Sequence, residues 1–135
     1  MSLHGRVLHT MIHVKDFNHS ISFYTDVLGM RVLRKGYDPS EARHNAFLGY
    51  ASEDESAVIE LTAYEDGRAY THGDAFGHLA LGFDDVKTAC HHISTKGGTI
   101  TREPYVIASG KTIAMIVDPD GYIIELVQPA PNYAS

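Results

Sequence analysis

The sequence has very few of the features that mark secreted, membrane-bound or nucleic-acid-binding proteins. Its single cysteine, Cys90, cannot form a disulfide within the chain. No apolar run is long enough to cross a membrane, and the N-terminus lacks the apolar core of a signal peptide. Lys and Arg number 11 against 17 Asp and Glu, the net charge is −6, and no basic cluster is present. Because phosphate binding depends on Lys and Arg, we expect no nucleic-acid partner, no membrane partner, and a reducing, cytoplasmic location.

The composition is that of a small folded protein. Of the 135 residues, 44% are hydrophobic and 21% are charged, which are ordinary proportions for a globular chain. This length is enough for one domain or for two half-size modules. A half of about 60 residues would be only marginally stable alone, so we expect any two modules to share an interface.

The most informative feature is a His–Glu pair that occurs twice at almost the same spacing. His9 precedes Glu60 by 51 residues, and His78 precedes Glu125 by 47. Each His lies in an alternating, strand-like run, and each Glu is the middle residue of Ile-Glu-Leu. An unpaired carboxylate is costly to bury. Two imidazoles and two carboxylates are a suitable ligand set for a divalent transition metal. Four unrelated structural residues are the alternative, but the repetition in register favours a metal site.

The residues that follow each His repeat as well. A helical pattern begins near Asp16 in the first copy and near Asp85 in the second, and glycine ends each one. Three strand-like runs then follow in both copies. We therefore predict an α+β fold of two βαβββ modules. The expected strands are Arg31–Lys35, Asn45–Tyr50 and Ala57–Ala63 in the first copy, and Thr99–Tyr105, Thr112–Val117 and Tyr122–Gln128 in the second.

The boundaries of the modules follow from this repeat. We place the first module at residues 7–63, the second at residues 77–128, and a polar linker at residues 64–76. Cys90 falls on the apolar face of the second helical pattern with no base nearby, so we interpret it as a buried small residue. The acidic run at residues 53–55 is interpreted as a solvated hairpin tip.

The ligand set also restricts the metal. It contains no cysteine, whereas structural zinc sites favour closed, thiolate-rich tetrahedra. Two nitrogen and two oxygen donors leave room for water in a six-coordinate shell, which suits Ni, Co, Mn or Fe, and Zn can also bind. An open coordination position would allow the metal to polarise a substrate oxygen.

Six segments of the chain carry a family pattern, and they are Leu8–Ile12, Ser20–Met30, Ala46–Tyr50, Val58–Thr62, Phe76–Ala80 and Asp118–Leu126. Together these segments resemble glyoxalase I (lactoylglutathione lyase), within the vicinal oxygen chelate superfamily. The resemblance covers about residues 7–127, and the His at the first ligand position of a compact chain is similar to the nickel- or cobalt-activated bacterial class.

The resemblance implies a fold, a site and a reaction. It implies a single glyoxalase-like domain of two βαβββ modules over residues 1–135, paired in a homodimer with metal sites at the subunit interface. Each site would take one His–Glu pair from each subunit, so that His9, Glu60, His78 and Glu125 hold one divalent metal. Ni or Co is the first candidate for this metal. The implied reaction is isomerisation of the methylglyoxal–glutathione hemithioacetal to S-lactoylglutathione. Glu125 would be the main base and Glu60 the opposing carboxylate.

The positions for the thiol depart from the family pattern. His13 and Tyr64 stand where glutathione-specific members usually carry Arg and Asn. Arg102 matches a position that holds a basic residue for the glutathione carboxylate, and Lys111 lies where it could help. We expect these four residues to bind the 2-oxoaldehyde–thiol adduct, with either weak glutathione binding or another cellular thiol.

Other activities occur on the same scaffold. An acyl-CoA epimerase is one alternative, and an extradiol dioxygenase is another. The dioxygenases use two His and one carboxylate, so the fourth ligand Glu60 argues against them. A metal-free protein that sequesters a drug is the third alternative, but such proteins generally lack the full ligand set.

Overall fold

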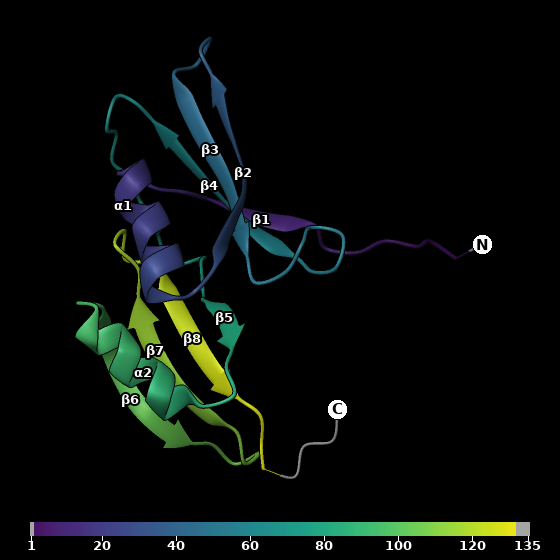
Figure 1. The fold of residues 1–135 in the computed structure, drawn as a ribbon, viewed down its shortest axis with the longest axis vertical. Helices are drawn as coiled ribbons and strands as arrows, with labels where there is room; N and C mark the ends of the chain where they lie inside the picture. Colours follow the sequence, from purple (N-terminus) through teal and green to yellow (C-terminus); the bar gives the residue numbers. More distant parts are fainter. Residues whose placement is uncertain (1, 132–135) are drawn as a thin grey trace. The chain divides into compact units, whose positions relative to one another are not determined.

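The computed structural model describes residues 2–131. The chain divides into two compact units, residues 1–70 and 71–135, and this boundary falls inside the segment expected as a linker. Each unit contains one four-stranded sheet and one helical segment (Figure 1). The units have the same order of elements, which is the repeat that the sequence predicts.

The first unit begins with the strand that carries His9. Its sheet has the strand order β1-β4-β3-β2, with β1 parallel to β4 and the other neighbours antiparallel. The helix α1 packs against β4. The elements are β1 (His9–His13), α1 (Phe17–Ser22), the π-helix η1 (Phe23–Val27), β2 (Arg31–Asp38), β3 (Arg43–Gly49) and β4 (Val58–Tyr64).

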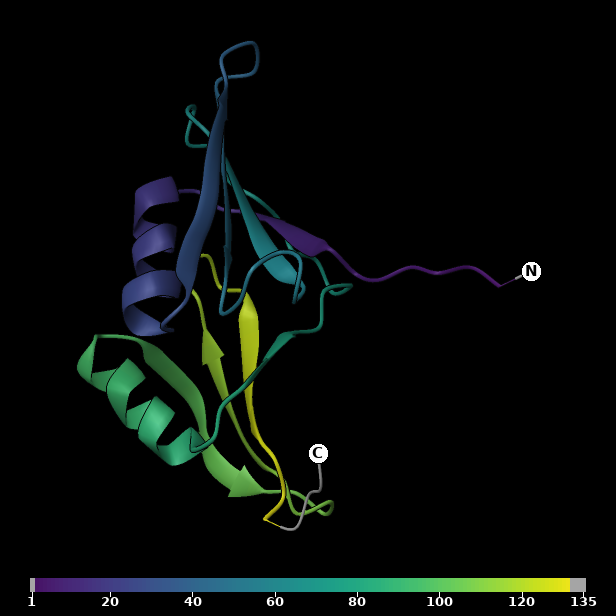
Figure 2. The same ribbon diagram turned by 45° about the vertical axis from the view of Figure 1, so that its right-hand side comes forward.

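The second unit repeats this topology. Its strand order is β5-β8-β7-β6, β5 is parallel to β8, and the remaining neighbours are antiparallel. The helix α2 lies along one face of the sheet, against β6, β7 and β8 (Figure 2). The elements are β5 (Leu79–Gly82), α2 (Val86–Thr95), β6 (Thr99–Val106), β7 (Thr112–Val117) and β8 (Ile123–Gln128).

The two helices begin in the same way and end differently. Asp16 accepts a hydrogen bond from the backbone N–H of His19, and Asp85 accepts one from that of Thr88, both at 3.0 Å. These N-caps satisfy backbone donors that a helix leaves free. After Ser22 the first helix widens into a π-helix. The expected helical pattern therefore does not continue as a regular α-helix to Leu28, because the N–H of Leu28 donates to the Phe23 carbonyl at 3.1 Å.

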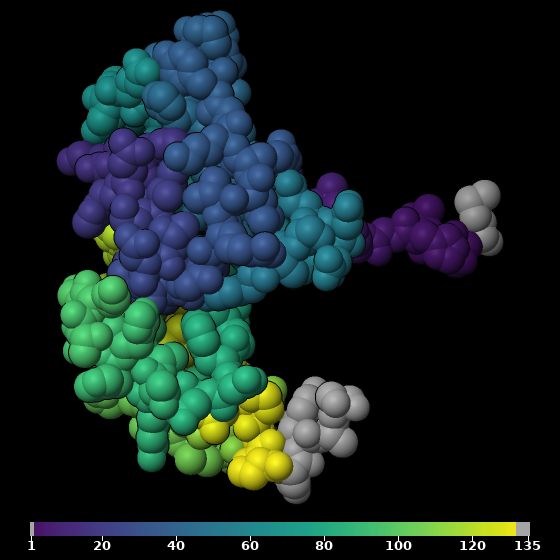
Figure 3. Space-filling model, in the orientation of Figure 1, coloured from purple at the N-terminus to yellow at the C-terminus, as the bar shows by residue number. Residues whose placement is uncertain are grey.

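The inner faces of the strands and helices form the core of each unit. The central strands of each sheet contain consecutive buried apolar residues, such as Ala46-Phe47-Leu48 on β3 and Ile113-Ala114 on β7. Figure 3 shows one face of each unit in space-filling form, coloured along the sequence. The largest fully buried apolar side chains are Val14, Tyr24, Leu48 and Leu61 in the first unit, and Val86, Ile93, Ile116, Ile124 and Leu126 in the second.

Most predicted strands agree with the observed ones, except at the hairpin of β2 and β3. β2 continues to Asp38, beyond the predicted end at Lys35, and β3 begins at Arg43 instead of Asn45. The extra pairs join residues that are exposed or half-buried and mostly polar, so they leave no apolar alternation in the sequence. Among residues 2–131, no helix is long and apolar enough to cross a membrane.

Candidate metal centre

In the first unit, neighbouring parallel strands bring His9 beside Glu60. Met11 on β1 pairs with Glu60 on β4, and His9 is two residues before Met11. Because strand side chains alternate between faces, His9 projects on the same face as Glu60. The Nε2 atom of His9 lies 3.3 Å from Oε1 of Glu60.

The second unit reproduces this arrangement. Ala80 on β5 pairs with Glu125 on β8, and His78, just ahead of β5, is again two residues before the partner of the glutamate. The Nε2 atom of His78 lies 3.5 Å from Oε1 of Glu125. The structure thus brings each His to the Glu with which the sequence pairs it.

The spacing of these donor atoms fits two ligands of one metal ion. Ligand atoms that each lie about 2.1 Å from an ion, at tetrahedral or right angles, are about 3.0 to 3.4 Å apart. The measured separations of 3.3 and 3.5 Å are close to that range. The carboxylates are largely covered, with Glu60 17% and Glu125 22% exposed. Each unit supplies two donors, and residues 2–131 contain no cluster of three or more metal-ligating side chains.

The two glutamates differ in what else they contact. In the first unit, Oε2 of Glu60 accepts hydrogen bonds from the Asn45 amide at 3.3 Å and from the Thr62 hydroxyl at 3.2 Å. In the described part of the second unit, no hydrogen bond reaches the carboxylate of Glu125, and His78 is its polar contact. The two units therefore share the His–Glu pair but differ in the hydrogen bonds that the glutamate accepts.

An aromatic ring packs beside the first pair. The Phe47 ring meets the His9 ring edge to face, with centroids 5.1 Å apart, and Phe47 pairs with Glu60 in the sheet. The guanidinium of Arg34 lies 3.6 Å from the Phe47 ring centroid. Arg34 also donates two hydrogen bonds, of 2.8 and 3.0 Å, to the carboxylate of Glu53.

The bond from Arg34 lowers the pKa of the Glu53 carboxyl below its usual value. Residues 53–55 lie in the turn between β3 and β4, as expected, and residues 54 and 55 are exposed. The Glu53 carboxylate has a further contact, since a bidentate ion pair ties it to Arg34 on β2.

Two of the expected substrate-binding residues lie together in the first unit. The His13 ring stacks on the Tyr64 ring with centroids 6.0 Å apart, and on the Tyr70 ring at 4.9 Å. The guanidinium of Arg68 lies 3.7 Å from the centroid of the Tyr64 ring and pairs with Asp66. The stacked rings of His13, Tyr64 and Tyr70, which we call the aromatic wall, lie at the end of β1.

The other two expected residues lie on different segments of the second unit. Arg102 is on β6, with its guanidinium 3.7 Å from the centroid of the Tyr105 ring. Lys111 lies in the turn between β6 and β7, where its carbonyl accepts a hydrogen bond from the N–H of Ile107.

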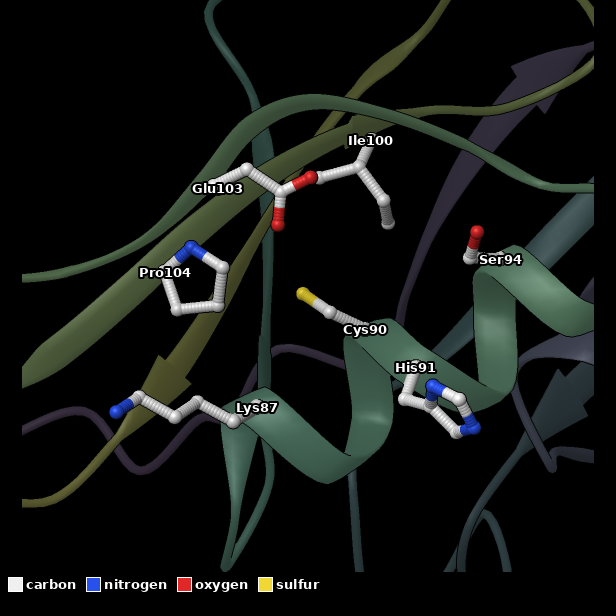
Figure 4. A pocket seen from close by; sticks show the side chains of 7 residues that line it. All are labelled: Lys87, Cys90, His91, Ser94, Ile100, Glu103 and Pro104. Atoms are coloured by element: carbon white, nitrogen blue, oxygen red, sulfur yellow. The ribbon is translucent and has the colours of Figure 1, made fainter.

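Cys90 is buried, as the sequence indicates. The residue is 5% exposed, and its side chain points from α2 toward β6 at a surface cavity of about 470 Å³ (Figure 4). Burial, together with the charge of Glu103, raises the pKa of the thiol. A thiol that stays protonated is a poor nucleophile, which agrees with the interpretation of Cys90 as a buried small residue.

The comparison with known families agrees with this fold and this arrangement of residues. The profile of the Glyoxalase/Bleomycin resistance protein/Dioxygenase superfamily matches residues 6–126. The chain belongs to this superfamily. A probable lactoylglutathione lyase of Vibrio cholerae is 51% identical over 99% of this chain and 97% of its own length. The lactoylglutathione lyase of Salmonella typhimurium is 48% identical over 91% of this chain and 92% of its own length.

Solved structures of glyoxalase superfamily members superimpose closely on the chain. Glyoxalase I from Zea mays gives a TM-score of 0.88 at 43% identity, covering 93% of this chain and 45% of the maize chain. The present chain thus spans slightly less than half the length of the maize protein. A trypanothione-dependent glyoxalase I from Leishmania major gives a TM-score of 0.82 at 44% identity, covering 93% of this chain and 87% of that protein.

Sequence reasoning about this superfamily member missed the residues that surround the first His–Glu pair. Thr62 follows Glu60 by two residues on one strand, so alternation places both side chains on the same face. Asn45 pairs with Thr62 on the neighbouring strand. Both positions are polar in the first copy and apolar in the second. This difference between the copies was the sequence signal that could have revealed them.

Proposed function

We propose that this protein is a metal-dependent lyase of the glyoxalase I type, which detoxifies methylglyoxal by isomerising its thiol hemithioacetal to the S-lactoyl thioester. The observation that carries the proposal is the His–Glu pair repeated in both units, with nitrogen-to-oxygen distances of 3.3 and 3.5 Å. The near-full-length similarity to proteins named lactoylglutathione lyase supports the same activity.

The ligands we propose are the two His–Glu pairs together. His9 and Glu60 supply one nitrogen and one oxygen donor, and His78 and Glu125 supply the same. Because the described part of each unit brings only two such donors together, a four-ligand site requires one pair of each kind. Nickel or cobalt is the first candidate, and Zn, Mn and Fe remain alternatives. When bound, the ion stabilises the negative charge that develops on the substrate oxygens.

The carboxylates supply the proton transfer. In the proposed reaction Glu125 removes the proton from the hemithioacetal carbon. The electron pair of that C–H bond forms a carbon–carbon double bond, and the π pair of the neighbouring carbonyl moves onto its oxygen, which gives an enediolate. Glu125 then returns the proton to the neighbouring carbon, the hydroxyl proton of the first carbon passes to the neighbouring oxygen, and the first carbon becomes the thioester carbonyl. The reaction is an isomerisation, so it needs no oxidant or reductant. Positioned bases of this kind typically contribute about 10²–10⁴-fold to the rate.

Recognition of the thiol is assigned to four side chains. We propose that His13 and Tyr64, stacked on each other, contact the thiol-bearing part of the adduct, and that Arg102 and Lys111 attract its carboxylates. An aromatic wall binds by packing, whereas the Arg and Asn usual in glutathione-specific relatives bind by directed hydrogen bonds. The Leishmania relative is described as trypanothione-dependent, so a thiol other than glutathione belongs in the test.

We also propose a homodimer in which each site takes one His–Glu pair from each subunit. Support comes from the resemblance to glyoxalase I and from the size of the units. Each unit is about half an ordinary domain, and modules of this size gain stability from a partner surface. In this arrangement the two units of one chain, together residues 1–135, act as a single glyoxalase-like domain.

The test begins with protein from which divalent ions have been removed by a chelator. Ni, Co, Mn and Zn are then added separately, bound metal is measured, and thioester formation is followed by ultraviolet absorbance with adducts of glutathione and of a second thiol. Activity that disappears with the ion and returns with Ni or Co is the expected result. Full activity of the metal-free protein, or no thioester with any ion and either thiol, would overturn the proposal.

A further inference from the structure

We propose that Asn45 and Thr62 are positioning residues that hold Glu60 in place as a fixed metal ligand, which leaves Glu125 as the carboxylate that moves the proton. This inference rests on the proposed function, and it divides between the two glutamates the roles that the repeat alone would make equal. It is carried by contacts within each unit.

The two oxygens of Glu60 face different partners. Oε1 lies 3.3 Å from Nε2 of His9, which is the side of the proposed ion. Oε2 accepts from the Asn45 amide at 3.3 Å and from the Thr62 hydroxyl at 3.2 Å. A carboxylate oxygen has about two lone-pair sites, and these two donors engage both of them. Oε1 is therefore the oxygen left for an ion, and Oε2 has no remaining site for a proton from a substrate.

The donors themselves are held by the sheet. Asn45 on β3 and Thr62 on β4 are paired in register, and Thr62 is 3% exposed. Both side chains are short, so little conformational entropy opposes the contact. Buried hydrogen-bond donors in fixed positions orient a metal ligand before the ion binds.

The second unit lacks this pair of donors. Glu125 pairs with Met115 as Glu60 pairs with Phe47. The equivalents of Asn45 and Thr62 are then Ile113 and Val127, which pair with each other in the same register. Their side chains cannot donate a hydrogen bond. Within residues 2–131, Glu125 keeps only the contact with His78, so its carboxylate can turn and accept a proton.

The first experiment removes the donors while keeping their volume. Thr62→Val and Asn45→Leu are made separately, with Thr62→Ser as the variant that keeps the hydroxyl. Metal affinity is measured by calorimetric titration with Ni, and coordination by the visible spectrum of the Co-loaded protein. We expect each of the first two variants to bind the ion about 10- to 100-fold more weakly, with an altered Co spectrum. At saturating metal, kcat should change far less, and Thr62→Ser should restore the affinity.

The second experiment transfers the donors to the other glutamate. Val127→Thr is nearly isosteric, and it is combined in a second variant with Ile113→Asn. Circular dichroism reports whether each variant is folded. We expect Val127→Thr to lower kcat at saturating metal without lowering the affinity for the ion, because the new donor restrains Glu125. The double variant should lower kcat further. If the double variant fails to fold, Val127→Thr alone decides this arm.

The outcomes separate this inference from the proposed function. Folded Thr62→Val and Asn45→Leu proteins with wild-type metal affinity and Co spectrum would overturn the assignment of Asn45 and Thr62. An unchanged kcat in folded Val127→Thr would overturn the proposal that Glu125 must be able to turn in order to accept the proton. In both cases a wild-type protein that binds metal and forms thioester keeps the proposed function intact. A wild-type protein that binds no divalent ion would overturn both this inference and the proposed function.

Discussion

The ring of His9 lies edge to face against the ring of Phe47, with planes inclined by 86° and centroids 5.1 Å apart. Phe47 is also the sheet partner of Glu60, so one aromatic side chain packs against both residues of the first pair. Arg34 covers the Phe47 ring and is anchored by Glu53. The orientation of the His9 imidazole is thereby set by side-chain packing.

Replacing Phe47 with Leu should weaken metal binding. Leu fills much of the space but has no flat ring to orient His9, so we expect an affinity for Ni about 10-fold lower. Calorimetric titration measures the change. Phe23→Leu is the matched control, since Phe23 is also buried in the first unit and packs against Tyr24. An equal loss in both variants would show that general destabilisation, and not the His9 contact, is responsible.

Replacing Glu125 with Gln should lower kcat by about 10²–10⁴-fold at saturating metal, the range expected when a general base is lost. The amide keeps the shape of the side chain but does not accept the proton. Glu60→Gln is the paired variant, and we expect it to reduce metal affinity more than kcat. Both are measured by thioester formation over a range of metal concentrations. Equal losses of kcat in the two variants would contradict the division of roles.

Mixing inactive subunits should restore activity if sites are shared across a dimer. His9→Ala and Glu125→Ala each damage both sites of a pure dimer. A mixed dimer collects both changes in one site and leaves the other intact, so random exchange should recover about a quarter of the wild-type sites. Thioester formation after subunit exchange measures this recovery.

The control for this experiment mixes His9→Ala with Glu60→Ala. These residues belong to the same unit, so every site in a mixed dimer keeps one damaged ligand and no recovery is expected. If the first mixture also shows no recovery, despite demonstrated exchange of subunits, the sites are not shared.

Changing the aromatic wall should alter the affinity for glutathione adducts. His13→Arg with Tyr64→Asn introduces the residues usual in glutathione-specific relatives, and we expect KM for the glutathione adduct to fall while kcat changes less. This is the pattern of binding that is equal in ground state and transition state. Steady-state kinetics with two thiol adducts measures it. A wild-type KM already in the low micromolar range, with no gain in the double variant, would argue that this wall accommodates glutathione directly.

The hydroxyl of Tyr50 should make the stability of the fold depend on pH in the alkaline range. It donates a hydrogen bond of 2.6 Å to the carbonyl of Leu28, and burial of the hydroxyl raises its pKa to about 12. An unfolded tyrosine has a pKa of about 10. The folded state therefore holds the proton more tightly, so Tyr50 contributes stability below pH 10 that is lost as the pH rises from about 10 to 12.

Two measurements check this expectation. The ultraviolet difference titration between wild type and Tyr50→Phe should show one tyrosinate forming near pH 12. The fall in Tm across the same interval should be shallower in the variant. Ionisation of Tyr50 at the pH of an unfolded tyrosine would contradict the assignment.

The sequence predicts the elements of this fold better than their pairing. Apolar alternation and N-capping aspartates locate the strands and the helix starts, because these signals are local. The π-helix at Phe23–Val27 has the same apolar spacing as an α-helix, so spacing alone does not reveal it. The parallel pairing of β1 with β4 depends on contacts between distant segments, and it is this pairing that places His9 beside Glu60.

The candidate site was predictable only in its repeated part. The His–Glu pairs stand out because two copies can be compared within one chain. Asn45 and Thr62 differ between the copies, so a search for repetition passes over them. Their importance follows from the direction of two hydrogen bonds, and the sequence does not state which oxygen of Glu60 accepts them.

The presence of both half-sites in one chain has a consequence for symmetry. A four-ligand site assembled from identical single modules would have identical carboxylates. In a chain that carries two modules, a residue of one copy can differ from its counterpart in the other. Asn45 and Thr62 beside one glutamate, with Ile113 and Val127 in the corresponding register of the other copy, are such a difference. In the proposed assignment, this asymmetry allows one carboxylate to hold the ion while the other carries the proton.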